Sequence, residues 1–375
     1  MKYRQNGYSI FGSYETWETE IPASGSGVII GQTDDELLIV TNNHVVTDST
    51  ALSVQFCDDT SVDAIVKGTD SEADIAVLSV KMTDIPTATR NAIKVAVIGN
   101  SDETELGEQV VVIGNALGYG QSVTAGVLSA KNRTIHTVDG DEVDLLQTDA
   151  AINPGNSGGA LLNMKGELIG INVAKTARTD VEGVGYSIPS SRFASIINDL
   201  SRLATKEDVP EAERGYLGVQ VKNIDKQTAA TFDMPLGVFI YKFTEGSSAQ
   251  NSGMQEKDII TALNGQKVLS YDELAKQLAK YRSGETVQVT VQRPNGNKYD
   301  TVEVEVTLGS KEGAQAQQGQ DTQESTDGQS GSDGAENDDS GEAPEGGNGL
   351  GGQFNFGDYG DLFRQFEEFF NQYQR

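Results

Sequence analysis

Ser157 lies in the stretch NPGNSGGA, residues 153–160, where it is surrounded by glycines and preceded by a proline. A serine hydroxyl is a weak nucleophile at neutral pH. It attacks a carbonyl only when an imidazole takes its proton and a carboxylate fixes the tautomer of that imidazole. Glycine-rich turns that contain a serine are also common, so a turn without chemistry is the alternative interpretation. The rest of the chain must supply the histidine and the carboxylate.

The chain has two histidines, His44 and His136, and both precede Ser157. GNSGG matches the G-x-S-x-G turn of α/β-hydrolases, but those enzymes carry the histidine after the serine, so that interpretation fails. His44 follows the apolar run ELLIVT, which places it at the end of an expected strand. His136 lies in a polar, irregular stretch with nothing nearby to orient it. His44 is therefore the better candidate for the general base of the two histidines, and a purely structural histidine is the alternative until a carboxylate partner is found.

Asp74 opens the apolar run DIAVLSV after the polar residues TDSEA. His44, Asp74 and Ser157 then occur in the order found in chymotrypsin-type double-barrel proteases. A simple turn aspartate is one alternative, and a subtilisin order, for instance Asp74 with His136, is another. Acyl transfer also develops an oxyanion, which the N–H groups of Gly155 and Ser157 can bind only if the turn lacks bulky side chains. We expect Gly155, Asn156 and Ser157 to form this oxyanion hole.

These residues must be positioned by short strands. From residue 26 to about 188, apolar runs such as GVII, VDAIV, VVVIGN and ELIGINVA alternate with turn residues, which predicts an all-β barrel or sandwich. A helix with Ser190 or Ser191 as its cap is expected to close this domain. A second, smaller domain from Gly215 combines further strands, an Asn264-Gly265 turn and a helix over 271–282 with a Ser270–Glu273 capping box.

Composition limits the other classes of function. The net charge of −28 disfavours nucleic acid and bare membrane as partners, and no apolar run is long enough to span a bilayer. The N-terminus lacks the apolar core of a signal peptide, and the single Cys57 rules out an internal disulfide. Residues 311–350 hold ten acidic residues against one lysine and no aromatic residue, which predicts a disordered acidic linker. Aromatic residues on one face of 356–375 predict an amphipathic helix that needs a partner surface.

Several segments together resemble the HtrA (Deg) family of serine proteases: SGSGVII, TNNHVV, SEADIAVLSV, IGNALGYGQSVTAGVLSA, QTDAAINPGNSGGALLN, GELIGINVA and GVGYSIPSSR. The resemblance covers about residues 24–309. It implies two β-barrels with the active site between them, with His44 as general base, Asp74 as its orienting partner and Ser157 as nucleophile. No metal or cofactor is implied.

The same resemblance implies roles for further residues. Ile152 would line the specificity pocket, Asn172, Val173 and Ala174 would pair with the substrate backbone, and Arg133 would match the arginine of the sensor loop. The second domain resembles a PDZ domain, in which Tyr216, Leu217, Gly218 and Val219 would bind a peptide carboxylate and add the peptide as a strand. Lys257 stands where such domains usually carry glycine. Trimer formation through N-terminal aromatic residues is implied, with Phe11, Tyr14 and Trp17 as candidates.

We therefore expect a mainly β protein, with a chymotrypsin-like double β-barrel followed by an α+β PDZ domain and a disordered acidic tail. The expected segments are an N-terminal segment 1–23, a protease domain 24–205, a linker 206–214, a PDZ domain 215–309, an acidic linker 310–355 and a C-terminal segment 356–375. The expected function is a serine endopeptidase of protein quality control that cleaves unfolded proteins after small or medium aliphatic residues. The expected partners are unfolded substrates, C-terminal peptides and two further copies of the chain.

The alternatives are a catalytically silent peptide-binding scaffold and a holdase chaperone. The resemblance implies an extracytoplasmic, membrane-associated or cell-envelope location, although no signal peptide or anchor is recognised in this sequence. Either an anchor is missing from this sequence or this member of the family is soluble.

Overall fold

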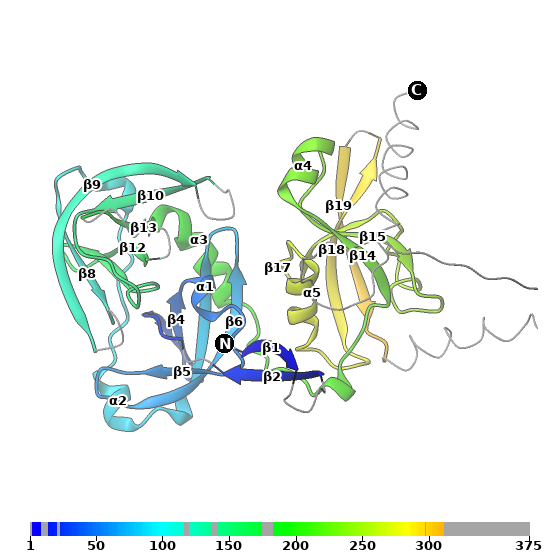
Figure 1. Ribbon diagram of the computed structural model, residues 1–375, viewed down its shortest axis with the longest axis horizontal. Coiled ribbons are helices and arrows are strands. Elements are labelled where there is room, and N and C mark those ends of the chain that lie inside the picture. Colours follow the sequence, from blue (N-terminus) through cyan, green and yellow to red (C-terminus); the bar gives the residue numbers. More distant parts are fainter. Residues whose placement is uncertain are drawn as a thin grey trace, which may run out of the picture. The chain divides into compact units, whose positions relative to one another are not determined.

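The computed structural model describes residues 2–8, 14–20, 23–115, 120–136, 142–174, 183–296 and 298–310, and for 2–8, 14–20, 135–136 and 142–143 it describes the backbone alone. The acidic linker, the C-terminal segment 356–375 and Phe11 lie outside these residues. The chain forms two compact units, whose main described segments end at Pro210 and begin at Glu211 (Figure 1). Strands β1 (Lys2–Tyr8) and β2 (Tyr14–Glu20) form an N-terminal hairpin. Among the described residues, no helix has the length and apolar character needed to cross a membrane.

The first sheet of the N-terminal unit is antiparallel, with the strand order β3-β4-β7-β6-β5. Its strands are β3 (Val28–Gln32), β4 (Glu36–Thr41), β5 (Leu52–Gln55), β6 (Ser61–Asp70) and β7 (Ile75–Lys81). The strands β4 and β7 are almost entirely apolar and buried, as expected for the central pair of a sheet. The short elements α1 (Asn43–Val46), η1 (Met82–Asp84) and α2 (Thr87–Ala92) connect and follow these strands.

The second sheet closes into a six-stranded barrel in the order β10-β13-β12-β11-β8-β9. Its strands are β8 (Gln109–Gly114), β9 (Ser122–His136), β10 (Glu142–Thr148), β11 (Ala160–Asn163), β12 (Leu168–Val173) and β13 (Gly185–Pro189), and η2 (Ser101–Glu103) precedes them. Leu128, Leu161 and Ile169 are fully buried inside it. A separate apolar cluster, which includes Val40 and Phe193, joins this barrel to the first sheet and to the helix α3 (Ser190–Ser201).

The predicted helix at the end of this domain is α3 (Figure 1). Its apolar face, with Phe193, Ile197 and Leu200, is buried against the strands. The predicted serine cap is wrong, because Pro189 occupies the N-cap position and Ser190 is the first helical residue. The Ser190 hydroxyl instead donates to the Gly99 carbonyl at 2.8 Å, which ties the start of the helix to the segment before η2.

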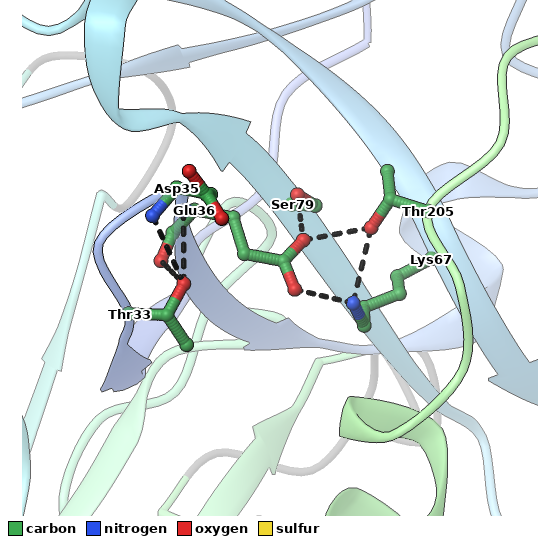
Figure 2. A network of polar contacts seen from close by, with 6 residues as sticks. All are labelled: Thr33, Asp35, Glu36, Lys67, Ser79 and Thr205. Atoms are coloured by element: carbon green, nitrogen blue, oxygen red, sulfur yellow. Dashed lines mark hydrogen bonds and ion pairs between the residues drawn. The ribbon is translucent and has the colours of Figure 1, made fainter.

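A polar network is enclosed between three strands and the segment after α3 (Figure 2). The Glu36 carboxylate on β4 pairs with the Lys67 ammonium on β6, whose side chain is only 4% exposed. It also accepts hydrogen bonds from Ser79 on β7 at 2.6 Å and from Thr205 at 2.7 Å. Because Thr205 follows α3, the network attaches this segment to the first sheet.

The C-terminal unit contains one sheet in the order β14-β15-β16-β18-β19, with β17 paired to β16. Its elements are η4 (Glu211–Glu213), β14 (Val219–Ile224), α4 (Lys226–Phe232), β15 (Gly237–Phe243), β16 (Ile259–Leu263), β17 (Gln266–Lys267), α5 (Tyr271–Leu278), β18 (Thr286–Asn295) and β19 (Lys298–Thr307). The mainly β fold class with barrel and sheets is confirmed for the described residues.

In this unit, the structure confirms some of the turns, caps and helix ends predicted from the sequence and differs from others. Asn264 and Gly265 both adopt positive φ, as the predicted hairpin turn requires. Ser270 caps α5 by accepting from the Glu273 N–H at 3.2 Å, although the Glu273 carboxylate binds the Leu269 N–H and not that of Ser270. Helix α5 ends at Leu278, four residues before the predicted end. Helix α4 was not predicted; Asp225 caps it by accepting from the Thr228 N–H at 2.8 Å.

The turn at Lys257 forms despite the absence of glycine. Lys257 adopts a left-handed conformation with φ +79°, and its N–H donates to the Ile240 carbonyl at 2.7 Å. The next residue, Asp258, is fully buried and accepts two hydrogen bonds from Arg293 at 2.8 and 2.7 Å. These contacts hold the turn in a conformation that costs a lysine about 1–2 kcal/mol relative to glycine.

Candidate active site

His44 and Asp74 meet because they lie at the same end of two paired strands. Strand β4 ends at Thr41 and β7 begins at Ile75, and the antiparallel register places Thr41 opposite Ala76. The His44 Nδ1 lies 2.7 Å from Asp74 Oδ2, and the His44 backbone N–H donates to Asp74 Oδ1 at 2.9 Å. Both carboxylate oxygens therefore bind the same histidine, which fixes the position and the ring orientation of His44.

The backbone of Asp74 is strained and is held by several contacts. Its φ is +55°, a left-handed conformation that costs a non-glycine residue on the order of 1–3 kcal/mol. Its carbonyl accepts from the Asn43 N–H at 3.1 Å and from the Asn42 side-chain amide at 3.0 Å. The segment around His44 thus holds both the carboxylate and the carbonyl of Asp74.

The residues before Ser157 form a type II turn. The Asn156 N–H donates to the Asn153 carbonyl at 2.9 Å, and Gly155, at the third position of the turn, has φ +98°. A type II turn requires positive φ at this position and favours proline at the one before it, which Pro154 supplies. Within the described part of the chain, the N–H groups of Gly155 and Ser157 donate to no protein acceptor. Two backbone donors that flank the Ser157 hydroxyl are therefore available to a ligand.

The glycines after Ser157 serve close packing. A Cβ atom on Gly158 would lie 2.2 Å from both the Ser26 carbonyl oxygen and Thr41 Oγ1, and its φ is +83°. A Cβ atom on Gly159 would lie 2.3 Å from the Ile113 carbonyl oxygen. The sequence interpretation had assigned the glycines to the oxyanion hole alone. The structure shows that Gly158 and Gly159 allow the turn to contact both sheets.

Gly25 packs between the Ser157 turn and Val45, the residue that follows His44 in the chain. A Cβ atom on Gly25 would lie 2.6 Å from Val45 Cγ1 and 3.3 Å from the Ser157 carbonyl oxygen. Ser157 is 7% exposed, and its Oγ accepts a hydrogen bond from the Ala174 N–H at 3.0 Å. Among the described residues, no hydrogen bond joins Oγ to His44.

The residues expected to bind substrate differ in their availability. Ile152 is buried and packs beside Gly185, where a Cβ atom would lie 2.9 Å from Ile152 Cδ1. Asn172 is fully buried: its N–H and carbonyl bind Gly159 and Gly158, and its side chain binds Ala160 and Ser187.

The backbone groups of alternate residues in a strand point the same way, so Asn172 and Ala174 face the Ser157 turn, while Val173 faces β13. Of the three residues, Ala174 is the one whose N–H contacts Ser157.

The structure does not bring Arg133 to this site. Arg133 is exposed on β9, opposite Leu145, and within the described residues no hydrogen bond or ion pair joins it to His44, Asp74 or Ser157. His136 ends β9, and its side chain lies outside the described part of the structure. The Asp74 carboxylate is occupied by His44, which disfavours the alternative pairing of Asp74 with His136.

A second candidate site lies at the start of β14 in the C-terminal unit. Leu217 is buried, and its carbonyl accepts from the Ala249 N–H at 3.0 Å. Gly218 has φ +70°, and a Cβ atom there would lie 2.4 Å from Ser247 Cβ. In the described part of the chain, the N–H groups of Leu217 and Gly218 have no protein acceptor, while that of Tyr216 donates to the Gly309 carbonyl at 2.9 Å. Val219 begins β14 opposite Phe243. Strand β14 is also an end strand of its sheet.

Sequence reasoning missed Ser26. Its hydroxyl contacts the Gly155 carbonyl at 2.8 Å across a separation of 129 residues. GVII was interpreted as a strand and SGSGVII as part of the family resemblance, and no local pattern indicates so distant a contact.

The chain is similar to known proteins over most of its length. Residues 25–171 match the trypsin-like peptidase domain family, and residues 215–308 match the PDZ domain family. The chain is 36% identical over 308 residues to the serine protease Do-like HtrA of Lactobacillus helveticus, an alignment that covers 77% of this chain and 70% of the relative. It is 37% identical to the protein of the same name from Bacillus subtilis, with 78% of this chain and 66% of the relative covered.

It is also 37% identical to the periplasmic pH-dependent serine endoprotease DegQ of Escherichia coli, covering 78% of this chain and 60% of the relative. A solved structure of the HtrA-type protease AlgW with a decapeptide is 30% identical, covers 80% of this chain and 84% of that chain, and has a TM-score of 0.41. A trypsin-like peptidase domain followed by one PDZ domain defines the class of protein. The chain belongs to the HtrA family of serine endopeptidases.

Proposed function

We propose that His44, Asp74 and Ser157 are the catalytic triad of this endopeptidase. The observation that supports this assignment most strongly is the double contact between the Asp74 carboxylate and His44. With Nδ1 bonded to Asp74, the neutral imidazole has its lone pair on Nε2, where it takes the proton of an attacking serine. Asp74 then stabilises the imidazolium that forms.

The turn before Ser157 supplies the second part of the mechanism. As Oγ bonds to the scissile carbonyl carbon, the π electrons move to the carbonyl oxygen, and the N–H groups of Gly155 and Ser157 donate to it. One such donor is worth roughly 10²–10³ in rate. Asn156, which is 1% exposed, connects the two donors and fixes their spacing. Collapse of this intermediate expels the amine, which takes the proton from His44, and water releases the acyl group by the same route.

The contact between Ala174 and Ser157 is compatible with this role. A hydroxyl that accepts a hydrogen bond keeps its own hydrogen for donation, so the Ser157 Oγ–H can point to His44. We propose that a substrate backbone pairs with the segment Asn172, Val173 and Ala174 mainly at Ala174, since the groups of Asn172 are already engaged. Ile152 packs beside Gly185 and would line a narrow specificity pocket. Such a pocket would favour small or medium aliphatic residues before the cleaved bond.

The PDZ domain is proposed to bind C-terminal peptides. The free N–H groups of Leu217 and Gly218 fit a terminal carboxylate, and the open edge of β14 from Val219 fits an added strand. The backbone N–H and carbonyl of Tyr216 both form hydrogen bonds with the backbone of Gly309, and these bonds would hold the loop in place.

Cellular role and assembly are also proposals. Because the DegQ relative is named periplasmic, we propose that this chain acts outside the cytoplasm on unfolded or misfolded proteins, at the cell envelope. We further propose a homotrimer assembled through Tyr14 and Trp17 on β2 together with Phe11, and a signalling role for Arg133 between neighbouring active sites.

The test is cleavage of casein by the parent and by Ser157→Ala, with labelling of Ser157 by a fluorophosphonate. Cleavage and labelling by the parent alone would support the triad. Equal cleavage by both proteins would reject it, and suppression of aggregation without any cleavage by either would indicate a holdase or a silent scaffold. Peptides with free apolar C-termini should change the parental rate, while the same peptides with amidated C-termini should not.

A further inference from the structure

Ser26 uses all of its polar groups to hold the turn that carries Ser157. Its Oγ donates to the Gly155 carbonyl at 2.8 Å and accepts from the Asn115 N–H at 2.8 Å. Its backbone N–H donates to the Ser157 carbonyl at 2.8 Å, and its carbonyl accepts from Thr41 Oγ1 at 2.7 Å. Ser26 therefore connects the first sheet, the end of β8 and the Ser157 turn.

The Ser157 N–H belongs to the Asn156–Ser157 peptide. The bonds from Ser26 fix the carbonyl group before this peptide, that of Gly155, and the carbonyl group after it, that of Ser157. The Gly155–Asn156 peptide is held at both ends, by Ser26 at its carbonyl and by Asn153 at its N–H. With the Gly155 and Ser157 carbonyls both fixed, the Ser157 N–H between them has little freedom to rotate. An oxyanion hole depends on such pre-oriented donors, since reorientation during the reaction would cost part of the stabilisation.

We propose that Ser26 is a positioning residue for the oxyanion hole, which it orients without touching the substrate. This inference rests on the proposed function of Ser157. A hydroxyl is suited to the position because one atom both donates to Gly155 and accepts from Asn115, which alanine cannot do. The loss of Ser26 Oγ would loosen the donors while leaving the bonds between His44 and Asp74 intact.

The test compares the parent with Ser26→Ala, Ser26→Thr and Ser157→Ala in cleavage of a fluorogenic peptide. We expect Ser26→Ala to lower kcat roughly 10- to 100-fold, in line with a misplaced catalytic group, with KM changed less than about twofold. The affinity for a peptide boronic acid, whose tetrahedral adduct places an oxygen in the oxyanion hole, should fall by a similar factor. The pH profile of kcat/KM should keep its shape, and Ser26→Thr, which retains the hydroxyl, should restore most of the rate.

Thr104→Val is the matched control, because it removes a buried hydroxyl-to-carbonyl bond of 2.7 Å in the same unit without contact to the turn. It should lose stability in thermal unfolding but keep the parental kcat. Parental kcat and boronate affinity in Ser26→Ala would overturn the inference while leaving the triad in place. Activity that survives Ser157→Ala would overturn the proposed function and this inference together. Should Ser26→Ala unfold at the assay temperature, Ser26→Cys, with a weak donor of similar size, replaces it in the same comparison.

Discussion

The Asp74 carboxylate accepts two hydrogen bonds from His44, one from the ring and one from the backbone. The backbone bond fixes the position of the carboxylate independently of the protonation state of the ring. The strained φ of Asp74 is held by the same segment, which makes the pair a rigid unit at the end of β4 and the start of β7.

Replacing Asp74 by asparagine tests the pair. We expect Asp74→Asn to fold, because the amide keeps the shape of the carboxylate, but to lower kcat by about 10³–10⁴-fold, since its NH₂ group stabilises the wrong tautomer of His44. The measurement is kcat for peptide cleavage, with folding followed by circular dichroism. The exposed Asp35, changed to asparagine, is the control and should keep the parental rate. A parental rate in Asp74→Asn would remove Asp74 from the mechanism.

Alanine substitutions at Gly158 and Gly166 separate the cost of close packing from the cost of backbone strain. Both have positive φ, at +83° and +78°, but a Cβ atom on Gly166 would meet nothing within 4 Å. Gly166→Ala should therefore cost only the backbone strain, about 1 kcal/mol. Gly158→Ala adds clashes with Ser26 and Thr41 and should cost on the order of 3 kcal/mol or more and abolish cleavage. Chemical denaturation of both variants measures the difference, and equal losses would show that strain alone requires glycine at Gly158.

Lys257→Gly is predicted to stabilise the C-terminal unit. The left-handed φ of +79° costs a lysine about 1–2 kcal/mol, part of which the greater backbone entropy of unfolded glycine offsets. We expect a net gain of roughly 0.5–1 kcal/mol, measured by thermal unfolding. Lys257→Ala is the reference, because it removes the long side chain but keeps the strain. No gain of glycine over alanine would contradict the prediction.

The Glu36 network predicts a loss of stability in acid. Burial raises the pKa of Glu36, but the hydrogen bonds from Lys67, Ser79 and Thr205 and the charge of Lys67 together lower it by more. The pKa of Glu36 in the folded state therefore lies below its ordinary value of 4.5. A depressed pKa adds stability that is fully present above the unfolded value and is lost as the pH falls through the folded value. When the pH drops under about 4.5, Glu36 takes up a proton and the melting temperature should therefore decrease.

Glu36→Gln should be less stable than the parent at pH 7, because it leaves the buried Lys67 without its counter-charge. The difference in melting temperature between the two proteins should shrink as the pH falls from 5 to 3, where the parent also loses the charge on Glu36. Asp35→Asn serves as the control, with a profile parallel to that of the parent. A constant difference between parent and Glu36→Gln would assign the acid transition to other carboxylates.

The sequence predicted that Asp74 orients His44, because His44 follows one apolar run, Asp74 opens the next, and the order His44, Asp74, Ser157 is that of chymotrypsin-type proteases. It also predicted the barrel strands, α3 and the turn at Asn264, since these depend on periodicity and turn chemistry within a few residues. It did not predict the four contacts of Ser26 or the fully engaged backbone of Asn172. Such contacts join segments far apart in the chain, and their geometry follows from barrel closure and register, which leave no local pattern.

The six strands β8 to β13 form a closed barrel, and this closure also protects the protein against aggregation through its strand edges. Unfolded chains are the proposed substrates of this protein. An aggregation-prone segment of such a chain can pair with an unpaired strand edge and recruit further chains. In the described residues, the barrel that carries Ser157 is closed, so each of its strands is paired on both sides. In the C-terminal unit, the proposed peptide edge is limited to the six residues Val219–Ile224, so strand addition there would end after one short segment. The barrel that positions Ser157 thus limits the ways in which unfolded chains, the proposed substrates, could start aggregation on this protein.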